Sequence, residues 1–577
     1  SKGVNLATMK NWNIVVATDT IPSEKYAAEE FQKFFAEACG VRLPIVTSID
    51  RPGQHIFIGP GKALRSSPIG FDVNDFGDED LRIIIRDNHI AIAGGRPRGT
   101  LYGVYTFLED YLGVRFLTND HTHVPPVGDW RVIGPVDRFY HPPLDYRFAN
   151  YGESVKYPLF AAKLRCNGAN TGYTERNTSY GAVTDDPRIG GDSRHYLINH
   201  SFYHQLRTEK YALDHPEYYA MLRPEYEGRK GVAGERSDHW ESQPCLTNPE
   251  VLRIIIAAGK DELKQRPQTR SISFSQNDGR GYCTCERCKA IDDHEESHMG
   301  SMLLFLNGVA DAIAETLPNV KASTLAYTYS QKPPKNIKPR PNVQIQLCSV
   351  PVSPLYAIGD PSCGQNEGFR QALAAWSRIC DDIGIWNYNL NHWNGLLPNP
   401  NMDVVESNIR FFVANNVRRV FMQSPGGVST EFSDLKNYVT CRLAWNPELS
   451  GRQLRNEFLH LHYGEAAGPI RDYLDLLHDR ARINTESKPW VSFCGWADNF
   501  GIDDEVIQAG MEAFEDALKL AGDDEVLRSR VEKASICAYT AAIAPACYWG
   551  SDNGYSLRPD QKPKPKIPAD LARRTRP

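Results

Sequence analysis

The sequence contains neither a long hydrophobic run nor an excess of positive charge. No apolar stretch approaches the roughly 18 residues that a membrane-spanning helix requires, so we expect no membrane span. The 577 residues carry a formal net charge of -6 at pH 7. A nucleic-acid-binding surface usually needs a basic stripe, and we therefore expect no nucleic acid as a partner.

Two motifs of cofactor and metal chemistry are also missing. No G-x-G-x-x-G sequence follows the first predicted strand, which argues against a dinucleotide-binding fold. The histidines His195, His200 and His204 occur without an H-E-x-x-H sequence, so substrate hydrogen bonding is the better interpretation of them. We assign no metal to the active site and expect no cofactor.

Cysteine is sparse, and its count of 13 is odd. A disulfide scaffold is usually denser and even-numbered, so at least one thiol is free unless it pairs between chains. Cys283, Cys285 and Cys288 lie close together and precede His294 and His298. Three interpretations stay open: a structural disulfide or plain thiols, a zinc site of three thiolates and one imidazole, and, with the least support, a catalytic thiol. In each case we expect the cysteines to stabilise the loop that precedes them, which carries Asp278.

The first part of the chain alternates between strand and helix patterns over residues 12–135, which predicts a small mixed sheet with helices on one face. A helix opens at Pro22 and ends at Gly40, and a hairpin turns at Asp87-Asn88. The Pro-rich stretch VDRFYHPPLDYRF marks a domain boundary.

Between roughly residues 145 and 445 a strand, loop and helix pattern repeats, which is the right size for a (β/α)8 barrel with long loops. The alternative is an open doubly wound sheet. After residue 447 helical periodicity dominates, and the end of the chain is a Pro- and charge-rich tail. The fold class is therefore α/β, with an N-terminal α/β domain (1–137), a central TIM-like barrel (138–446) and a helical C-terminal region (447–577). The predicted barrel strands are LDYRF, GANTGYT, SISFSQ, KASTLAYTY, NVQIQLC, IGIWNYN and RRVFMQS.

Carboxylates are scarce at the predicted strand ends, where a barrel places its catalytic groups. Asp278, directly after Asn277, is the only acid at such a position. An acid surrounded by Tyr and Trp side chains suits general acid catalysis, and Asp278 is our leading catalytic candidate. An Asx-turn in Asn-Asp-Gly without any chemistry is an equally good local interpretation.

The other strand ends carry amides and aromatic rings, which suit the hydroxyl edge and the apolar face of a sugar. Ordinary core aromatics are the alternative interpretation. We predict that Tyr327 and Asn387 assist catalysis by holding a reacting group. The predicted substrate-binding residues are His200, His204, Asn277, Trp386, Tyr388, Asn391, His392 and Trp393.

Several motifs together resemble a known family. AGGRPRGTLYGVYTFLEDYLGVRF is similar to the end of the small domain that precedes the barrel in bacterial α-glucuronidases and β-hexosaminidases. HPEYYAM, QPCLTNPEV, SFSQNDGRGYCTCERC, LAYTYSQKPP and NIRFFVANNVRRVFMQ resemble, in order, a large bacterial domain family related to glycoside hydrolases that include endo-β-N-acetylglucosaminidases. The resemblance implies a glycan-cleaving barrel enzyme that is usually exported. We therefore expect a secreted or periplasmic location, although Ser1–Asp19 shows no signal-peptide core.

The chain departs from this family at two strand ends. Relatives often have Trp-Asp-Tyr where this chain has Asn387 between Trp386 and Tyr388, and an acid where it has Met422. The adjacent Asp-Glu pair of hexosaminidases is also absent. Glycoside hydrolysis usually needs two carboxyl groups. Three routes remain: a 2-acetamido group of the substrate as nucleophile, with Asn387 or Tyr327 holding it; a loop carboxylate as partner; or loss of catalysis. The loop candidates are Glu367, Glu431 and Asp434.

We therefore predict a glycoside hydrolase that acts on an oligosaccharide or polysaccharide. An N-acetylhexosaminide is slightly favoured over a uronide, because a uronate carboxylate suits an Arg cluster and only Arg147 and Arg280 are candidates for one. The alternatives are a hydrolase or lyase acting on uronic-acid-containing glycans and a non-catalytic glycan-binding protein. A homo-oligomer is compatible with the sequence.

Overall fold

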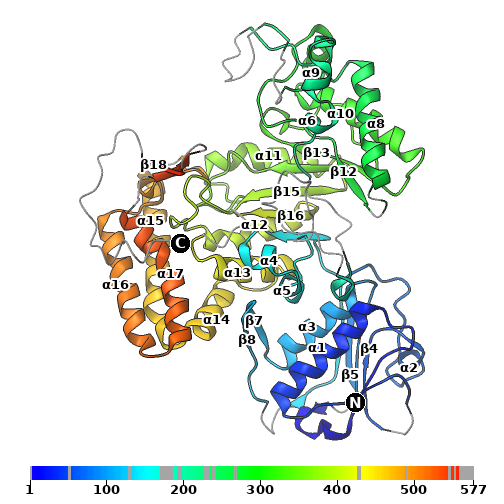
Figure 1. The fold of residues 1–577 in the computed structure, drawn as a ribbon, viewed down its shortest axis with the longest axis vertical. Coiled ribbons are helices and arrows are strands. Elements are labelled where there is room, and N and C mark those ends of the chain that lie inside the picture. Colours follow the sequence, from blue (N-terminus) through cyan, green and yellow to red (C-terminus); the bar gives the residue numbers. More distant parts are fainter. Residues whose placement is uncertain are drawn as a thin grey trace.

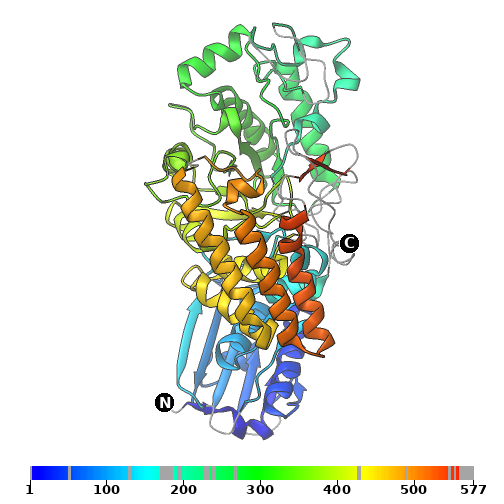
Figure 2. The ribbon, with the colours of Figure 1, turned by 90° about the vertical axis from the view of Figure 1, so that its left-hand side faces the viewer.

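The computed structural model describes residues 3–49, 53–127, 132–168, 186–191, 198–224, 234–236, 242–265, 267, 269–424, 430–487, 490–543, 547–550 and 554–557. Along the molecule, an N-terminal mixed sheet is followed by a central parallel sheet, and a set of C-terminal helices lies beside the central sheet (Figure 1 and Figure 2). The α/β class and this order of parts confirm the sequence prediction at that level.

The N-terminal sheet has six strands in the order β10-β5-β6-β4-β2-β3. Neighbours among β2, β3, β4 and β6 run parallel, whereas β5 and β10 pair antiparallel. The predicted mixed sheet is thus confirmed, and β10 crosses the boundary that we predict at residue 137. The strands are β2 (Asn13–Val15), β3 (Ile45–Val46), β4 (His55–Ile58), β5 (Leu81–Arg86), β6 (His89–Gly94) and β10 (Val136–Tyr140).

Local sequence explains how this sheet is connected. Helix α1 (Pro22–Cys39) ends at Gly40, whose φ of 71° is easily adopted by glycine. Asp87 (φ 50°) and Asn88 (φ 59°) form the tight turn between β5 and β6. Helices α1 and α3 (Gly99–Tyr111) pack on each other and cover one face, as predicted. A smaller apolar cluster under α2 (Lys62–Arg65) fills the other face.

The central sheet is parallel, in the order β11-β16-β15-β14-β13-β12. Its first strand along the chain, β11, pairs with its last, β16, and this is the pairing that closes a (β/α)8 barrel. On the other edge of β11 the N–H of Gly168 donates to the carbonyl of Arg147 (3.0 Å), where a further strand would begin. Gly168 is the first residue of the predicted strand GANTGYT, and the rest of that prediction lies outside the described residues. The strands are β11 (Tyr146–Ala149), β12 (Ser271–Ser273), β13 (Lys321–Ala326), β14 (Val343–Cys348), β15 (Ile383–Tyr388) and β16 (Val417–Gln423).

The strands of this sheet are buried on both faces, as is usual where helices cover a parallel sheet. Every residue of β14 is buried, including the glutamines that alternate with its apolar residues. Four of the helices in this region were predicted: α8 (Pro249–Gln265), α10 (Met299–Ala314), α11 (Glu367–Trp376) and α12 (Met402–Ala414). Helix α9 (Glu286–Glu295) was not predicted. Shorter elements are β1 (Val4–Asn5), β7 (Arg115–Thr118), β8 (His121–His123), β9 (Val132–Ile133), α4 (Gly152–Lys156), α5 (Pro158–Lys163), α6 (Phe202–Gln205) and α7 (Thr208–Tyr211).

The C-terminal region is helical, as predicted, and none of the described helices is long and apolar enough to cross a membrane. Helix α13 is buried along its whole length and contacts β11. Helical periodicity in the sequence predicts that the last helix runs through DDEVLRSRVEKASICAYTAAIAPACYW, and the end of this prediction is wrong: the helix stops at Ile543, and the strands β17 (Cys547–Gly550) and β18 (Gly554–Leu557) form a hairpin after it. The helices are α13 (Ser433–Trp445), α14 (Gly451–Tyr463), α15 (Ala467–Ser487), α16 (Asp504–Ala521) and α17 (Glu525–Ile543).

Buried charges join the N-terminal domain to the central sheet. Arg147 in β11 is almost fully buried and forms an ion pair with Glu79. Glu109 in α3 pairs with Arg165 and with Arg442 of α13, the latter at 3.2 Å. Burial alone would raise the pKa of Glu109, but the two guanidinium charges outweigh it and hold that pKa below its ordinary value.

We predict that Glu79→Gln destabilises the protein strongly, because it leaves the buried Arg147 charge without a counter-ion. Losing one partner of a buried pair costs about 3–5 kcal/mol. The matched control is Asp137→Asn, whose partner Arg82 is about one-third exposed, and which should cost under about 1 kcal/mol. Denaturant unfolding followed by tryptophan fluorescence measures both, and equal midpoint shifts for the two variants would contradict the assignment.

Candidate active site

Asp278 lies just beyond the C-terminal end of β12, and its side chain is 69% exposed. Tyr327 directly follows the neighbouring strand β13, and its hydroxyl donates a hydrogen bond to Asp278 Oδ1 (3.1 Å). Burial raises the pKa of Tyr327 above its ordinary value, and the negative charge of Asp278 adds to the effect. The phenol therefore keeps its proton at neutral pH and remains a donor.

His200 completes this group from a loop that precedes β12 in sequence. Its Nδ1 lies 2.6 Å from the carbonyl oxygen of Gln276. A carbonyl only accepts hydrogen bonds, so Nδ1 carries the proton and Nε2 faces Asp278 Oδ1 at 3.8 Å. The ring also packs edge-on against Tyr327, with 5.5 Å between centroids. Three of the predicted residues, Asp278, Tyr327 and His200, are thus brought together.

Asn277, which we predict to bind substrate, is instead buried, with only 1% exposed. Its Nδ2 donates to the Ser242 carbonyl (2.8 Å), and its Oδ1 accepts from the Tyr203 N–H (2.7 Å). The side chain of Gln243 bonds both backbone groups of Asn277, at 3.0 and 2.7 Å. Asn277 is therefore occupied by the protein itself, and the arrangement fixes the backbone from which Asp278 projects.

Gln276 and Ser330 fix Tyr327 in the same way. The Gln276 side chain donates to the Tyr327 carbonyl (3.2 Å) and accepts from the Ser330 hydroxyl (2.5 Å). The Ser330 hydroxyl in turn accepts from the Tyr327 N–H (3.1 Å). These hydrogen bonds thus connect the segments that follow β12 and β13, next to the Asp278–Tyr327 pair.

The end of β15 presents the predicted Trp386, Asn387 and Tyr388. Trp386 is buried, and its indole N–H donates to the Gln423 side chain (2.7 Å). Asn387 is also buried and bonds Ser349 (3.0 Å) and Asn389 (2.5 Å) through its side chain. Tyr388 is half-buried and stacks on Phe493, with 4.3 Å between centroids. Of the three, Tyr388 offers its ring most directly to a ligand.

The loop after β15 is covered by a segment of the C-terminal region. Asn391 is buried, and its side chain makes two hydrogen bonds with the backbone of Gly495, at 2.8 and 3.2 Å. The His392 N–H donates to the Phe493 carbonyl (2.7 Å), and Trp393 packs against Trp496 at 4.5 Å. Burial lowers the pKa of His392, and the negative charge of Asp278 opposes this effect.

Sequence reasoning missed Phe493 and Trp496. The available signal was the aromatic, aperiodic stretch WVSFCGW between two strongly helical segments. His204, the remaining predicted residue, lies on α6 with its ring 4.0 Å from that of Tyr203.

The three loop carboxylates considered as partners for Asp278 differ in their surroundings. Glu367 pairs with Arg370 at the exposed start of α11. Asp434 accepts two hydrogen bonds from Lys533 of α17, at 2.8 and 2.7 Å. Glu431 is buried beside Lys436, and burial raises the pKa of Glu431 to about 7. Glu367 and Asp434 are thus held by cations elsewhere in the molecule.

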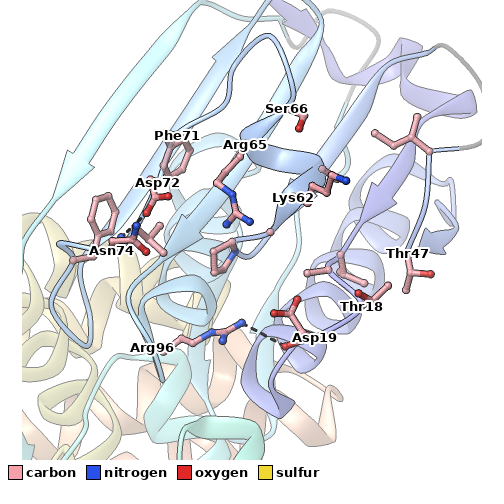
Figure 3. A pocket seen from close by; sticks show the side chains of 18 residues that line it. Thr18, Asp19, Thr47, Lys62, Arg65, Ser66, Phe71, Asp72, Asn74 and Arg96 are labelled. Atoms are coloured by element: carbon pink, nitrogen blue, oxygen red, sulfur yellow. Dashed lines mark hydrogen bonds between the residues drawn. The ribbon is translucent and has the colours of Figure 1, made fainter.

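A separate hollow of about 1090 Å³ lies in the N-terminal domain, between the ends of β2 and β4 (Figure 3). Lys62, Arg65 and Arg96 line it together with Asp19 and Asp72. Arg96 is paired with Glu24. The lining mixes charges of both signs and contains none of the residues that the sequence predicts to be catalytic.

The cysteines assemble differently from the prediction. Cys283, Cys285 and Cys288 are joined by Cys245, and the four sulfurs lie within 4.8 Å of one another. The two histidines proposed as a fourth ligand are engaged elsewhere: His298 stacks on Tyr282 and approaches Asp292, and His294 lies on the exposed side of α9. The idea of an imidazole ligand is therefore wrong, and a fourth thiol takes its place.

Comparison with known proteins adds a family and a fold. The profile of a family described as "Domain of unknown function (DUF4838)" matches residues 116–475, more than half of the chain. No curated protein matches the sequence. A family GH115 4-O-methyl-alpha-glucuronidase with specificity for decorated arabinogalactans superposes with a TM-score of 0.54 at 9% identity, over 94% of this chain and 72% of that chain.

Two further solved structures are more distant. A GH138 enzyme targeting pectin rhamnogalacturonan II has a TM-score of 0.46 at 10% identity, over 92% of this chain and 69% of that one. A GH20 exo beta-N-acetylglucosaminidase from Vibrio harveyi has a TM-score of 0.41 at 12% identity, over 78% and 74%. At 9% identity, the likeness to the GH115 enzyme concerns the fold alone.

The raised pKa of Glu431 generates a prediction for stability. Between its ordinary value of 4.5 and about 7, the folded protein keeps a proton that the unfolded chain has released. Stability should therefore fall as pH rises through this window, by about 3 kcal/mol in total. Glu431→Gln cannot titrate, so the unfolding free energy of the variant relative to wild type should increase by that amount from pH 4.5 to 7 and then stay level.

Unfolding melts across this pH range measure the difference. The control is Glu367→Gln, because the ion pair with Arg370 and the contact with Gln371 lower the pKa of Glu367 and its titration falls below the window. A wild-type to Glu431→Gln difference that does not change with pH would refute the assignment.

Proposed function

The chain belongs to the family described as Domain of unknown function (DUF4838). From its glycoside hydrolase-like fold we propose that it is a glycoside hydrolase acting on a complex glycan. We propose an N-acetylhexosaminide as the substrate and substrate-assisted hydrolysis as the mechanism. The single observation that carries the proposal is the hydrogen bond from Tyr327 to Asp278 at adjacent strand ends.

Asp278 has the position and the freedom that a general acid needs. It projects from the C-terminal edge of a parallel sheet, where glycoside hydrolases of this fold place their chemistry. Its side chain is exposed, while its neighbours Asn277 and Gln276 are buried and hydrogen-bonded. A rigid backbone that presents one accessible carboxyl group supports acid–base catalysis on a bound ligand.

The proposed reaction needs only one carboxyl group from the protein. Asp278 donates its proton to the glycosidic oxygen, and the bond between this oxygen and the anomeric carbon breaks. The acetamide oxygen of the same sugar forms a bond to the anomeric carbon and gives a cyclic oxazolinium ion. Asp278, now a carboxylate, takes a proton from water, and the resulting hydroxyl opens the ring. Tyr327 holds Asp278 in place through both steps.

The surroundings of the loop carboxylates favour this route over a second protein nucleophile. Glu367 and Asp434 are each engaged by a cation, and Glu431 is enclosed beside Lys436. The stacked pair Tyr388–Phe493 and the tilted pair Trp393–Trp496 are half-buried aromatic surfaces of the kind that bind the apolar faces of sugar rings.

A uronide is the second candidate substrate, favoured by one cation. Arg280 is exposed and follows Asp278 by two residues, and a guanidinium there can pair with a uronate carboxylate. The other candidate, Arg147, is buried against Glu79 and does not reach a ligand. The structurally similar GH115 enzyme is itself a glucuronidase. Cleavage of uronides is therefore one of the activities to be tested.

A panel of glycans that end in N-acetylhexosamine or in a uronic acid separates these possibilities. Hydrolysis yields new reducing ends, whereas elimination on a uronide also yields an unsaturated product that absorbs in the ultraviolet. A thiazoline analogue of the cyclised acetamide should inhibit only the substrate-assisted reaction. Cleavage of uronides alone, without thiazoline inhibition, would favour the second candidate. A sugar-dependent rise in melting temperature without any product would indicate a binding protein.

We predict that Asp278→Asn removes hydrolysis while the fold is retained. Loss of a general acid lowers the rate by about 10²- to 10⁴-fold, and this exposed side chain contributes little packing. The control is Asp311→Asn, an exposed carboxylate paired with Arg340, which should leave activity unchanged. Reducing-end release on the substrate found in the panel measures both variants, and full activity of Asp278→Asn would exclude the mechanism.

We predict a smaller effect for Tyr327→Phe, which removes one hydrogen bond to a carboxyl group. Such a bond is worth about 1.5–3 kcal/mol, so kcat should fall about 10- to 100-fold. KM should change little, because the ring and its contact with His200 remain. An unchanged kcat together with a raised KM would instead assign Tyr327 to ground-state sugar binding.

A further inference from the structure

Four cysteine sulfurs converge next to the loop that carries Asp278. The sulfurs of Cys245, Cys283, Cys285 and Cys288 all lie within 4.8 Å of one another, and those of Cys245 and Cys285 are 3.7 Å apart. A disulfide requires about 2.05 Å. Four sulfurs at the corners of a tetrahedron around zinc, each about 2.3 Å from the metal, are about 3.8 Å apart. The spacing fits a tetrathiolate metal site rather than a disulfide.

The four ligands come from two segments that the backbone already holds together. The Cys245 N–H donates to the Tyr218 carbonyl (2.8 Å), which ties the first segment to residues 218–221. The Thr284 N–H and hydroxyl both donate to the Met221 carbonyl, at 2.8 and 2.9 Å, which ties the second segment to the same residues. These hydrogen bonds bring both ligand-bearing segments to residues 218–221.

Polar groups around the sulfurs are placed to stabilise thiolates. The Met221 N–H points at the Cys283 sulfur (3.3 Å), and the Thr247 hydroxyl lies 3.3 Å from the Cys288 sulfur. Cys285 caps the N-terminus of α9, where the helix dipole favours negative charge. Hydrogen bonds of this kind orient the ligands in metal sites.

The packing around the cluster is too small to hold it by itself. Its buried members are Ala220, Cys245, Cys283 and Cys288, and they form an apolar cluster distinct from the main core. Met221 and Cys285 pack against it. Because three of four buried members are cysteines, little apolar area supports this part of the molecule unless the sulfurs are linked to one another.

We propose that Cys245, Cys283, Cys285 and Cys288 bind one zinc ion in a closed, structural site that fixes the base of the Asp278 loop. Each thiol loses its proton as its sulfur binds, so one zinc ion replaces four protons. Soft thiolate ligands in tetrahedral geometry select zinc over calcium or magnesium. Four protein ligands leave no position for water or substrate, so the metal takes no part in chemistry.

The test measures the metal directly on the full chain. Protein purified without added chelator should contain about one zinc per chain by elemental analysis. Cys245→Ser and Cys285→Ser should each lose it. Cys39→Ser, which changes a partly buried free cysteine in the N-terminal domain, should keep it. A zinc-free wild-type protein, iron in place of zinc, or zinc retained in both ligand variants would overturn the proposal.

A second readout does not depend on whether the variants fold. Wild-type protein exchanged with Co²⁺ should show the visible bands and the near-ultraviolet sulfur-to-metal charge transfer of a tetrahedral tetrathiolate. Thiol titration of the denatured protein without reductant should find all four sulfurs reduced, and a disulfide among them would also refute the site. Removal of zinc with a chelator should lower the melting temperature of wild type. None of these measurements uses enzymatic activity, so the result stands whether or not the proposed function holds.

Discussion

Buried charge pairs fix how the first strand of the central sheet leaves the N-terminal domain. Glu79 and Glu109 belong to that domain, whereas Arg147, Arg165 and Arg442 belong to the chain that follows it. The guanidinium groups of Arg147 and Arg165 also lie over the ring of Trp445, at 5.1 and 5.4 Å from its centre. A charge in such a place is tolerated only while its partner is present, so the domains cannot shift independently. Arg147 thus joins the N-terminal domain to β11, the strand that pairs with β16.

The buried charge pairs and the candidate active site lie at opposite ends of the central strands. The charges surround the start of β11, near the Leu144 carbonyl that Arg147 also bonds. Asp278 and Tyr327, by contrast, follow the C-terminal ends of their strands, and Tyr388 is the last residue of β15. In barrels that division is general: one end of the strands holds the fold, and the loops at the other carry the site. Here the loops are themselves fixed by amide side chains. The Gln276 side chain donates to the Tyr327 carbonyl, and the Gln243 side chain accepts from the Asn277 N–H. Side-chain hydrogen bonds thus connect the backbone beyond the end of β12.

Periodicity predicted the elements, because burial on one helix face or on both faces of a strand leaves a local pattern. The helix from Pro22, the hairpin at Asp87 and the strands β13 to β16 all followed from it. Contacts between distant segments leave no such pattern. Cys245 lies beside three cysteines from another segment. Arg147 is buried against Glu79, and the side-chain amide of Asn391 donates to the carbonyl of Gly495. Each depends on the topology, which one sequence does not display.

Asn277 and Asp278 show how these constraints meet in two adjacent residues. Asn277 is 1% exposed and fully used by the protein, while the side chain of Asp278 is 69% exposed. A group that exchanges protons with a ligand must be reachable, so the rigidity it needs has to come from its flanks. The amide network holds the residue before Asp278, and the cysteine cluster begins five positions after it. Between Asn277 and Cys283 the residues Asp278 and Arg280 are exposed, and under the proposed mechanism the partner of Asp278 is a nucleophile that arrives with the substrate.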